Sequence, residues 1–227
     1  MSRLANTRVL VTEAHAYMGP AIVELFRGEG ADVIADDRDL RPRDAAASAV
    51  AEAAPFDALV ANLAEPPRLA STQAISDDDW HRLFDALVHP LMRLVRAALP
   101  AMIDRRRGKI VAVTSAAPLR GIPRAAAYCA ARGAQNAFVR AVGLEVACHN
   151  VQVNAIAQNY VENDVYYPPS MLADPVLLDR MKKAIPAGRL AAASESAELA
   201  LFLCSERCNF MVGQVVPFAG GWVTTTG

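Results

Sequence analysis

Three side chains near the middle of the chain could together move a proton. Tyr128 and Arg132 are four residues apart in a helical pattern from about Ala125 to Cys148, and residues at this spacing share one helix face, with Cβ atoms ~5–6 Å apart. A phenol has a pKa of about 10, and a cation within a few ångströms lowers such a pKa by about 1–3 units. Ser115 follows the strand-like run Lys109 to Thr114. Because open α/β sheets bind ligands at the carboxyl ends of their strands, Ser115 is expected at a binding edge.

The elements that would position these residues alternate between β-rich apolar runs and longer helical patterns. This alternation is typical of βαβ units around a parallel sheet. The expected strands are Arg8 to Thr12, Asp32 to Ala35, Ala58 to Ala61, Lys109 to Thr114, Val151 to Ala157 and Val215 to Phe218. The expected helices are Met18 to Gly28, Ala45 to Ala54, Asp77 to Arg106, Ala125 to Cys148, and shorter ones near 174–184 and 194–205. The sequence predicts an α/β fold, a Rossmann-like doubly wound parallel sheet in three α/β/α layers, as a single domain over residues 1–227.

The first half of the chain is short for a nucleotide-binding unit. Only about twenty residues separate the second expected strand from the one at Ala58 to Ala61, which is room for a single helix. A full nucleotide-binding half needs a further βα unit there, so we expect one unit and part of an adenine pocket to be missing. Pro90 and Pro100 fall inside the long helical pattern that begins near Asp77 and are expected to kink or break it.

Composition excludes several classes of partner. The formal net charge of −1 and the pI of about 6.4 indicate neither nucleic acid nor an anionic membrane as a partner. The apolar runs fall short of the ~18–20 residues that would cross a bilayer, and the polar start carries no secretory signal. The four cysteines, Cys129, Cys148, Cys204 and Cys208, form no pattern of metal-ligand spacing. These features predict a reduced, cytoplasmic protein without a metal.

Several segments resemble the short-chain dehydrogenase/reductase superfamily over nearly the whole chain. They are the turn at Val11-Thr12, LVAN ending at Asn62, RAALPAM at 96–102, IVAVTSAA at 110–117, Tyr128, VQVNAIA at 151–157 and GQVVPFAGGW at 213–222. Such a resemblance implies the fold expected above. It also directs attention to the positions where this chain departs from the dehydrogenase pattern.

The first departure lies in the turn that holds the dinucleotide in dehydrogenases. The family pattern Thr-Gly-x-x-x-Gly-x-Gly keeps only its last glycine here, in the run from Thr12 to Gly19. Those glycines let the pyrophosphate approach the helix N-terminus closely. Tyr17 places a large ring where a phosphate would lie, and Glu13 adds a negative charge nearby. We therefore expect no NAD(P) and no other cofactor.

The second departure lies in the catalytic motif. The family's Tyr-x-x-x-Lys becomes Tyr128-x-x-x-Arg132, with Ser115 at the usual separation of thirteen residues. Further departures are Gln158-Asn159 in place of Pro-Gly, Asn163 in place of a threonine, and Leu87 in place of the proton-relaying asparagine. A Ser-Tyr-Arg triad with an altered glycine turn resembles the halohydrin dehalogenases. The segments HAYMG at 15–19, VHPL at 88–91, SAA at 115–117 and AQNYV at 157–161 are similar to one branch of that family.

This resemblance implies a reaction and a role for each residue. A vicinal halohydrin would become an epoxide, a halide ion and a proton, and small anions such as cyanide, azide or nitrite would open the epoxide in reverse. Tyr128 would be the general base, Arg132 its cation, and Ser115 the group that orients the substrate oxygen. Backbone N–H groups of the loop Asn159, Tyr160 and Val161 would bind the halide. The expected walls of the halide and substrate pocket are Tyr17, Tyr166 and Tyr167.

Two other functions remain open at this point. One is an NAD(P)-dependent oxidoreductase with an unusual turn, and the other is a non-catalytic protein on the same scaffold. The long helices resemble those that pair between subunits in this superfamily, so a homotetramer or a dimer is expected.

Overall fold

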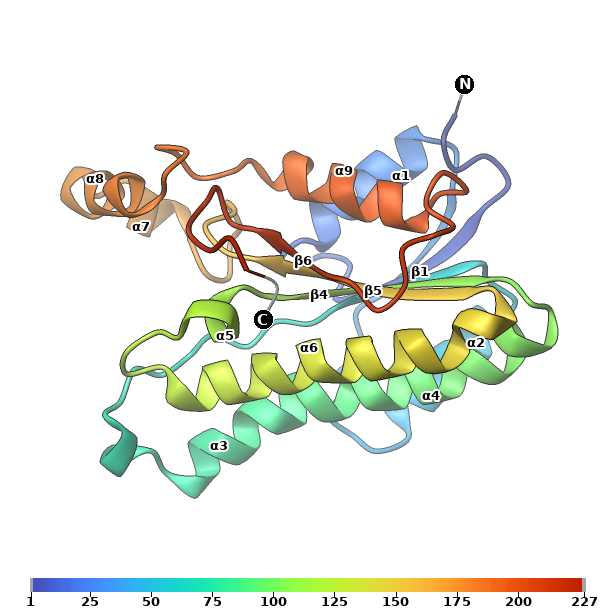
Figure 1. Ribbon diagram of the computed structural model, residues 1–227, viewed down its shortest axis with the longest axis horizontal. Coiled ribbons are helices and arrows are strands. Elements are labelled where there is room, and N and C mark those ends of the chain that lie inside the picture. The colour runs from blue at the N-terminus through green and yellow to red at the C-terminus, as the bar shows by residue number, and fades with distance from the viewer. Residues whose placement is uncertain (1, 226–227) are drawn as a thin grey trace.

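The computed structural model describes residues 2–225, and its elements follow the order β1-α1-β2-α2-β3-α3-α4-β4-α5-α6-β5-α7-α8-α9-β6, with three short helical turns η1–η3 between them (Figure 1). The strands are β1 Arg8–Thr12, β2 Asp32–Asp36, β3 Ala58–Asn62, β4 Gly108–Ser115, β5 Val151–Gln158 and β6 Val215–Phe218. The helices are α1 Gly19–Gly28, α2 Ala45–Ala53, α3 Asp77–Leu83, α4 His89–Asp104, α5 Ala117–Arg120, α6 Ala126–Val146, α7 Pro169–Leu172, α8 Pro175–Ala184 and α9 Ala193–Cys204.

All six strands are parallel and lie in the order β2-β1-β3-β4-β5-β6. The register pairs Ser115 with Gln158 across β4 and β5, so the last residues of these two strands lie side by side at one edge. Within residues 2–225 the sheet ends at β2. The Rossmann-like three-layer fold is thus confirmed, and so is the absence of one βα unit outside β2 in the part of the chain that the structure describes.

Helices cover both faces of this sheet, as parallel strands require (Figure 1). Helices α1 and α9 pack on one face, and α2, α4 and α6 pack on the other. Every residue of β3, β4 and β5 is therefore buried. The strands run toward the end of the molecule that carries α5, α7 and α8, where the site residues gather.

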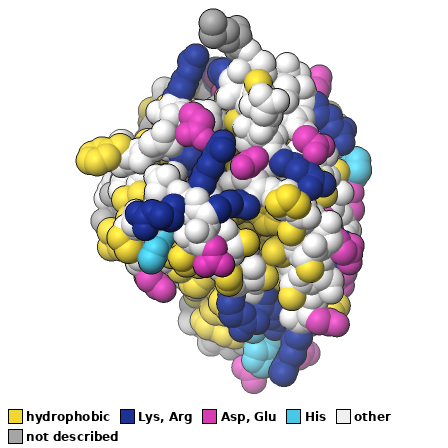
Figure 2. Space-filling view, turned by 90° about the vertical axis from the view of Figure 1, so that its right-hand side faces the viewer, with side chains coloured by type: hydrophobic (Ala, Val, Ile, Leu, Met, Phe, Trp, Pro, Cys, Tyr) yellow, Lys and Arg dark blue, Asp and Glu magenta, His cyan; other side chains and the backbone are white. Residues whose placement is uncertain are grey.

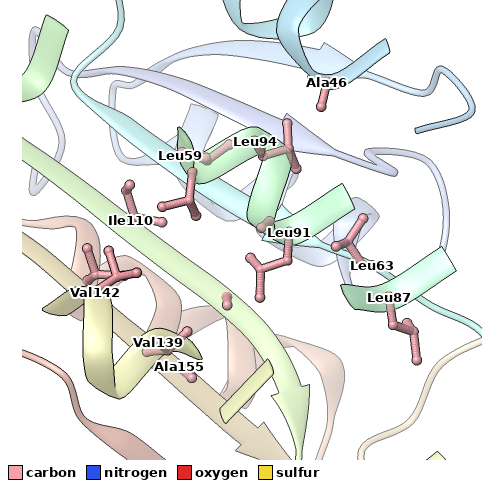
Figure 3. Close-up of a cluster of buried hydrophobic side chains, with 14 of the residues drawn as sticks. Ala46, Leu59, Leu63, Leu87, Leu91, Leu94, Ile110, Val139, Val142 and Ala155 are labelled. Atoms are coloured by element: carbon pink, nitrogen blue, oxygen red, sulfur yellow. The ribbon is translucent and has the colours of Figure 1, made fainter. Parts of the chain in front are cut away.

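The larger core cluster lies between the sheet and the α4–α6 layer (Figure 3). Strand residues Leu59 and Ile110 meet Leu91 and Leu94 of α4, each at most 1% exposed. These leucines recur at helical spacing, so α4 presents one apolar stripe to the sheet.

The long helix of the sequence prediction is a composite of three pieces. Helix α3 continues through the π-helical turn η2, Phe84–Val88, into α4. Pro90 lies in the first turn of α4, directly after η2, so the regular α-helical ladder does give way next to this proline. The expected break at Pro100 is wrong, because α4 runs through it to Asp104. Packing of the flanking Ala98 and Met102 against the sheet outweighs the one missing N–H donor.

The composite helix Asp77–Asp104 is also long and apolar enough to pass a length-and-composition test for a membrane span, with a mean hydropathy of 1.3. Its apolar stripe packs on the sheet as part of the core.

The opposite end of the molecule, where the strands begin, has a mixed surface (Figure 2). Basic, acidic and hydrophobic side chains alternate there. Three consecutive arginines at residues 105–107, just before β4, lie at this end, and Arg105 and Arg106 donate to the carbonyls of Phe56 and Cys148. Arg107 pairs with Glu206 at 3.0 Å.

Candidate active site

Ser115 and Tyr128 line one pocket of about 190 Å³ at the carboxyl ends of the strands. Ser115 is the last residue of β4, and its Oγ accepts a hydrogen bond from the Ala117 N–H at 3.0 Å. Tyr128 lies in the first turn of α6 and is 7% exposed. The strand and the helix therefore direct a hydroxyl and a phenol to the same cavity.

The remaining pocket residues come from the end of β5 and from the segments that follow β1, β3, β4 and β5. All of them are uncharged: Tyr17, Pro67, Leu69, Ala117, Ile122, Ala125, Gln158, Asn159, Tyr160, Val161, Asn163, Tyr166 and Tyr167. The structure thus brings together the residues that the sequence singled out as Tyr17, Asn159, Tyr160, Val161, Tyr166 and Tyr167. An uncharged, largely apolar lining suits a small neutral molecule.

Arg132 lies behind the pocket and is completely buried. It makes five hydrogen bonds, which match the five N–H groups of a guanidinium. Nε donates to the Tyr128 hydroxyl at 3.2 Å. Nη1 donates to the Val113 carbonyl and to Gln135 Oε1, and Nη2 donates to the Leu63 carbonyl and to the Tyr166 hydroxyl. Every one of these acceptors is neutral.

The buried charge of Arg132 is therefore left without a carboxylate bonded to it. Burial by itself lowers the pKa of Arg132, but its interactions with Tyr128, Tyr166 and Tyr17 reverse the sign, and the net pKa is raised. The guanidinium also lies 5.4 Å from the centre of the Tyr128 ring. A buried cation with neutral partners attracts any negative charge that forms beside it.

Tyr166 has a second role that the sequence did not reveal. Its hydroxyl accepts from Arg132 Nη2 at 2.7 Å and from the Glu65 N–H at 3.1 Å. Burial raises the pKa of Tyr166 well above its ordinary value, and its ring packs 5.1 Å from the ring of Tyr17 and 6.2 Å from that of Tyr128. Tyr166 is a neutral phenol that both walls the pocket and holds the arginine.

The turn between β1 and α1 does not fit a dinucleotide. Glu13 and Tyr17 carry side chains at φ values of 44° and 57°, in a conformation that favours glycine. The buried Tyr17 hydroxyl accepts from Gln158 Nε2 at 2.9 Å, and Gln158 Oε1 accepts from Ser196 at 2.8 Å. Tyr17 is thus fixed as a wall of the pocket.

Glu13 contributes less charge to this turn than the sequence suggested. One of its carboxylate oxygens accepts from the Ala64 N–H at 2.9 Å, and burial raises the pKa of Glu13 to about 7. At neutral pH the carboxyl is therefore only partly ionised. Its bulk and its bond to Ala64, more than electrostatic repulsion, close the turn.

Two acidic residues at the end of β2, Asp36 and Asp37, are bonded to other side chains. Asp36 is buried and accepts from Arg38 Nε at 2.7 Å, and Arg38 also pairs with Glu52 at 2.7 Å. Asp37 pairs with His15. These carboxylates are therefore bonded within the protein.

Among residues 159–161, directly after β5, one backbone N–H donor is unpaired. The Asn159 N–H donates to the Phe218 carbonyl, and the Tyr160 N–H donates to the Asn159 side chain. The Tyr160 carbonyl and the Glu162 N–H both bond to Ala191, so the N–H of Val161 lies on the opposite side of the chain. Among residues 2–225 it has no acceptor. Because Val161 also lines the pocket, its N–H is available to an anion.

Aromatic rings enclose the same loop. Tyr160 packs against Tyr167 at 6.0 Å and edge-on against Trp222 at 5.9 Å. The Tyr167 hydroxyl donates to Asn159 Oδ1 at 2.9 Å, and burial raises the pKa of Tyr167. No group of three or more metal-ligating side chains occurs within the described part of the chain.

Comparisons with known proteins match this architecture over most of its length. A profile of the family described as enoyl-(acyl carrier protein) reductase matches residues 39–223. A solved structure described as "Dehalogenation enzyme" superposes with a TM-score of 0.92 at 32% identity, covering 97% of this chain and 100% of that one.

Two curated relatives are named as a reductase and as an inactive dehydrogenase. The 3-oxoacyl-[acyl-carrier-protein] reductase FabG of Chlamydia muridarum is 31% identical over 163 residues, 72% of this chain and 64% of that protein, so the match spans less than two thirds of its length. An "Inactive 2-(S)-hydroxypropyl-CoM dehydrogenase 2" of Xanthobacter autotrophicus is 35% identical over 198 residues, 86% of this chain and 84% of that protein.

Proposed function

The chain belongs to the short-chain dehydrogenase/reductase superfamily, and from this premise we propose that it is a cofactor-independent halohydrin dehalogenase, a lyase that converts vicinal halohydrins to epoxides. The observation that carries the proposal is the buried Arg132, bonded to Tyr128 and to four further neutral acceptors. A reductase would also need a nucleotide, and Tyr17 and Glu13 occupy the turn that would receive it.

In the proposed reaction the substrate supplies its own nucleophile. Ser115 donates to the substrate oxygen and orients its proton toward the Tyr128 phenolate, which accepts that proton. The oxygen forms a bond to the neighbouring carbon while the carbon–halogen bond breaks, and the halide takes the bonding electrons. Proximity is built into the substrate, so the protein supplies a base, worth ~10²–10⁴ in rate, and a place for the halide.

Arg132 would stabilise the phenolate form of Tyr128 by charge attraction in a water-poor environment. The Tyr166 hydroxyl, kept neutral by burial, holds the Arg132 guanidinium at 2.7 Å. The leaving halide would be received by the N–H of Val161 among the rings of Tyr17 and Tyr167. Preorganised donors of this kind stabilise developing negative charge.

The same arrangement supports the reverse reaction. A small anion such as azide, cyanide or nitrite would enter at Val161, open the epoxide and leave its oxygen to take a proton from Tyr128. The uncharged lining of the 190 Å³ pocket favours short, uncharged halohydrins and epoxides. A substrate with a carboxylate or an ammonium group would lose its hydration without finding a partner.

Assembly and location are parts of the same proposal. We expect a cytoplasmic homotetramer, or a dimer, formed through the layer of α4 and α6, without nucleic-acid or membrane partners. Leu144 of α6 is 71% exposed and Trp80 of α3 is 39% exposed, and the four cysteines are unpaired. Light scattering of the purified protein measures the number of subunits.

The deciding experiment uses purified, dialysed protein with 1,3-dichloro-2-propanol and no added nucleotide. We expect chloride release and epoxide formation at a rate that NAD(P)H does not change. A reductase, which the names of the curated relatives favour, would instead oxidise NAD(P)H with a ketone substrate and quench its tryptophan fluorescence on binding nucleotide. A non-catalytic protein would do neither. An anomalous bromide peak at Val161 in a soaked crystal would locate the halide site.

A further inference from the structure

Gln135 connects the buried arginine to the π-helical turn η2, and the proposed reaction does not use it. It lies on α6 three residues after Arg132 and is 1% exposed. Its Nε2 donates to the Leu87 carbonyl at 2.7 Å, and its Oε1 accepts from Arg132 Nη1 at 2.9 Å. We infer that Gln135 is a positioning residue that clamps the Arg132 guanidinium against Tyr128, with the Leu87 carbonyl as its anchor.

The two ends of the Gln135 amide have only one consistent arrangement. A backbone carbonyl accepts and a guanidinium donates, so the NH₂ group must face Leu87 and the oxygen must face Arg132. The carbonyl of Leu87 belongs to η2, where the helix departs from regular α-helical geometry next to Pro90. Departures of this kind inside long helices are frequent at functional sites.

A neutral amide suits this place better than a carboxylate. At 2.9 Å from Nη1, a carboxylate would pair with the guanidinium and cancel the charge that Tyr128 needs. The amide accepts the same hydrogen bond and leaves the charge in place. Gln135 therefore holds the orientation of Arg132 without reducing its positive potential.

Gln135 can also be changed without altering the pocket. The other side chains bonded to Arg132 are Tyr128 and Tyr166, which both line the cavity, whereas Gln135 does not. The titratable groups that interact with Arg132 are Tyr128 on its own helix, Tyr166 and Tyr17 from the loops, and Glu13 from the β1–α1 turn. A variant at Gln135 leaves all four in place.

The test compares Gln135→Leu and Gln135→Glu with the wild type and with Gln152→Leu. Gln152 is a second buried glutamine, 4% exposed, on β5 and bonded to Asn150, so its loss reports packing damage alone. For halide release we expect Gln135→Leu to lower kcat about 10-fold with little change in KM, because one hydrogen bond to a charged group is lost. In Gln135→Glu the pH of half-maximal activity should rise by about one unit. Gln152→Leu should change neither quantity per folded molecule.

These activity measurements rest on the proposed function, and a second readout does not. Phenolate absorbance is followed against pH in wild type and Gln135→Glu, each with and without Tyr128→Phe, and the difference isolates Tyr128. We expect its phenolate signal to appear at higher pH in Gln135→Glu, even if no halohydrin is turned over. Equal titration of Tyr128 in both backgrounds, or loss of activity only in proportion to unfolded protein, overturns the inference. If the wild type releases no halide but the Tyr128 phenolate signal still moves to higher pH in Gln135→Glu, only the proposed function is overturned.

Discussion

Arg132 and Arg38 show two opposite ways of holding a guanidinium in this molecule. Arg38, at the end of β2, is about one third exposed and bonds the carboxylates of Asp36 and Glu52. Arg132 is fully buried and bonds only neutral groups. The charge of Arg38 is cancelled where it lies, whereas the charge of Arg132 stays available to the pocket. Arg38 is thus neutralised by two carboxylates, whereas Arg132 is held by hydrogen bonds to neutral groups alone.

The largest effect should come from removing the unpaired charge. Arg132→Met leaves the buried carbonyls of Leu63 and Val113 without their donor and takes away the cation beside Tyr128. We expect halide release to fall by at least about 100-fold and the free energy of unfolding to fall by about 3 kcal/mol. Denaturant titration and an assay normalised to folded protein measure the two effects. Retained activity would mean that the buried charge has no part in the reaction.

Removing the hydroxyl of the proposed base, Tyr128, should separate the effect on catalysis from the effect on stability. Tyr128→Phe keeps the ring and deletes the hydroxyl that Arg132 contacts at 3.2 Å. We expect a loss of about 10²–10⁴ in kcat, with an unfolding free energy within about 1–2 kcal/mol of the wild type. Tyr160→Phe, in the same pocket, is the matched control and should retain measurable turnover. Comparable losses in both variants would remove Tyr128 from the role of base.

The burial of Glu13 in the β1–α1 turn can be tested through the pH dependence of protein stability. The ordinary pKa of this carboxyl is 4.5 and burial raises it to about 7 in the folded protein. The folded state therefore binds the proton more tightly, so the contribution to stability is complete below pH 4.5 and is lost as the pH rises through 7. We expect Glu13→Gln to be more stable than wild type at pH 8 by about 3 kcal/mol, and the difference to vanish below pH 4.5. Melting curves at several pH values measure it, and parallel curves would contradict the buried, protonated carboxyl.

The smallest effect on stability and activity is expected from replacing Arg38, which is paired with carboxylates. Arg38→Met removes a partly exposed ion pair with Asp36 and Glu52, and such pairs contribute about 0–1 kcal/mol. Activity should stay unchanged, because Arg38 lies outside the pocket that Tyr128 lines. A large loss of halide release in this variant would contradict the view that only Arg132 acts on the pocket.

The sequence was sufficient for features that depend on local pattern and spacing. The alternation of apolar runs and helical patterns predicted the six strands of the sheet. The short span before Ala58 predicted that the sheet ends at β2. The thirteen-residue and four-residue separations of Ser115, Tyr128 and Arg132 predicted residues that the structure brings to one site. Their catalytic roles remain a prediction.

Features that depend on tertiary contact were not predictable in the same way. Tyr166 holds Arg132 from 34 residues away, and Gln135 finds its carbonyl on a different helix, 48 residues away. The i,i+3 spacing of Gln135 from Arg132 was a usable signal, because it places both on one face of α6. The predicted break at Pro100 was wrong because packing of α4 against the sheet outweighed the local tendency of proline to interrupt a helix.

The position of β2 at the end of the sheet affects the tendency of two molecules to associate through their strands. A strand on the margin presents unpaired N–H and C=O groups to which a strand of another molecule can add. Here that margin is only five residues long, and it carries the exposed Asp32 paired with Arg8 at 3.0 Å. A short ribbon edge bearing fixed charges is a poor template for intermolecular β-pairing, which protects the shortened sheet from growing into aggregates.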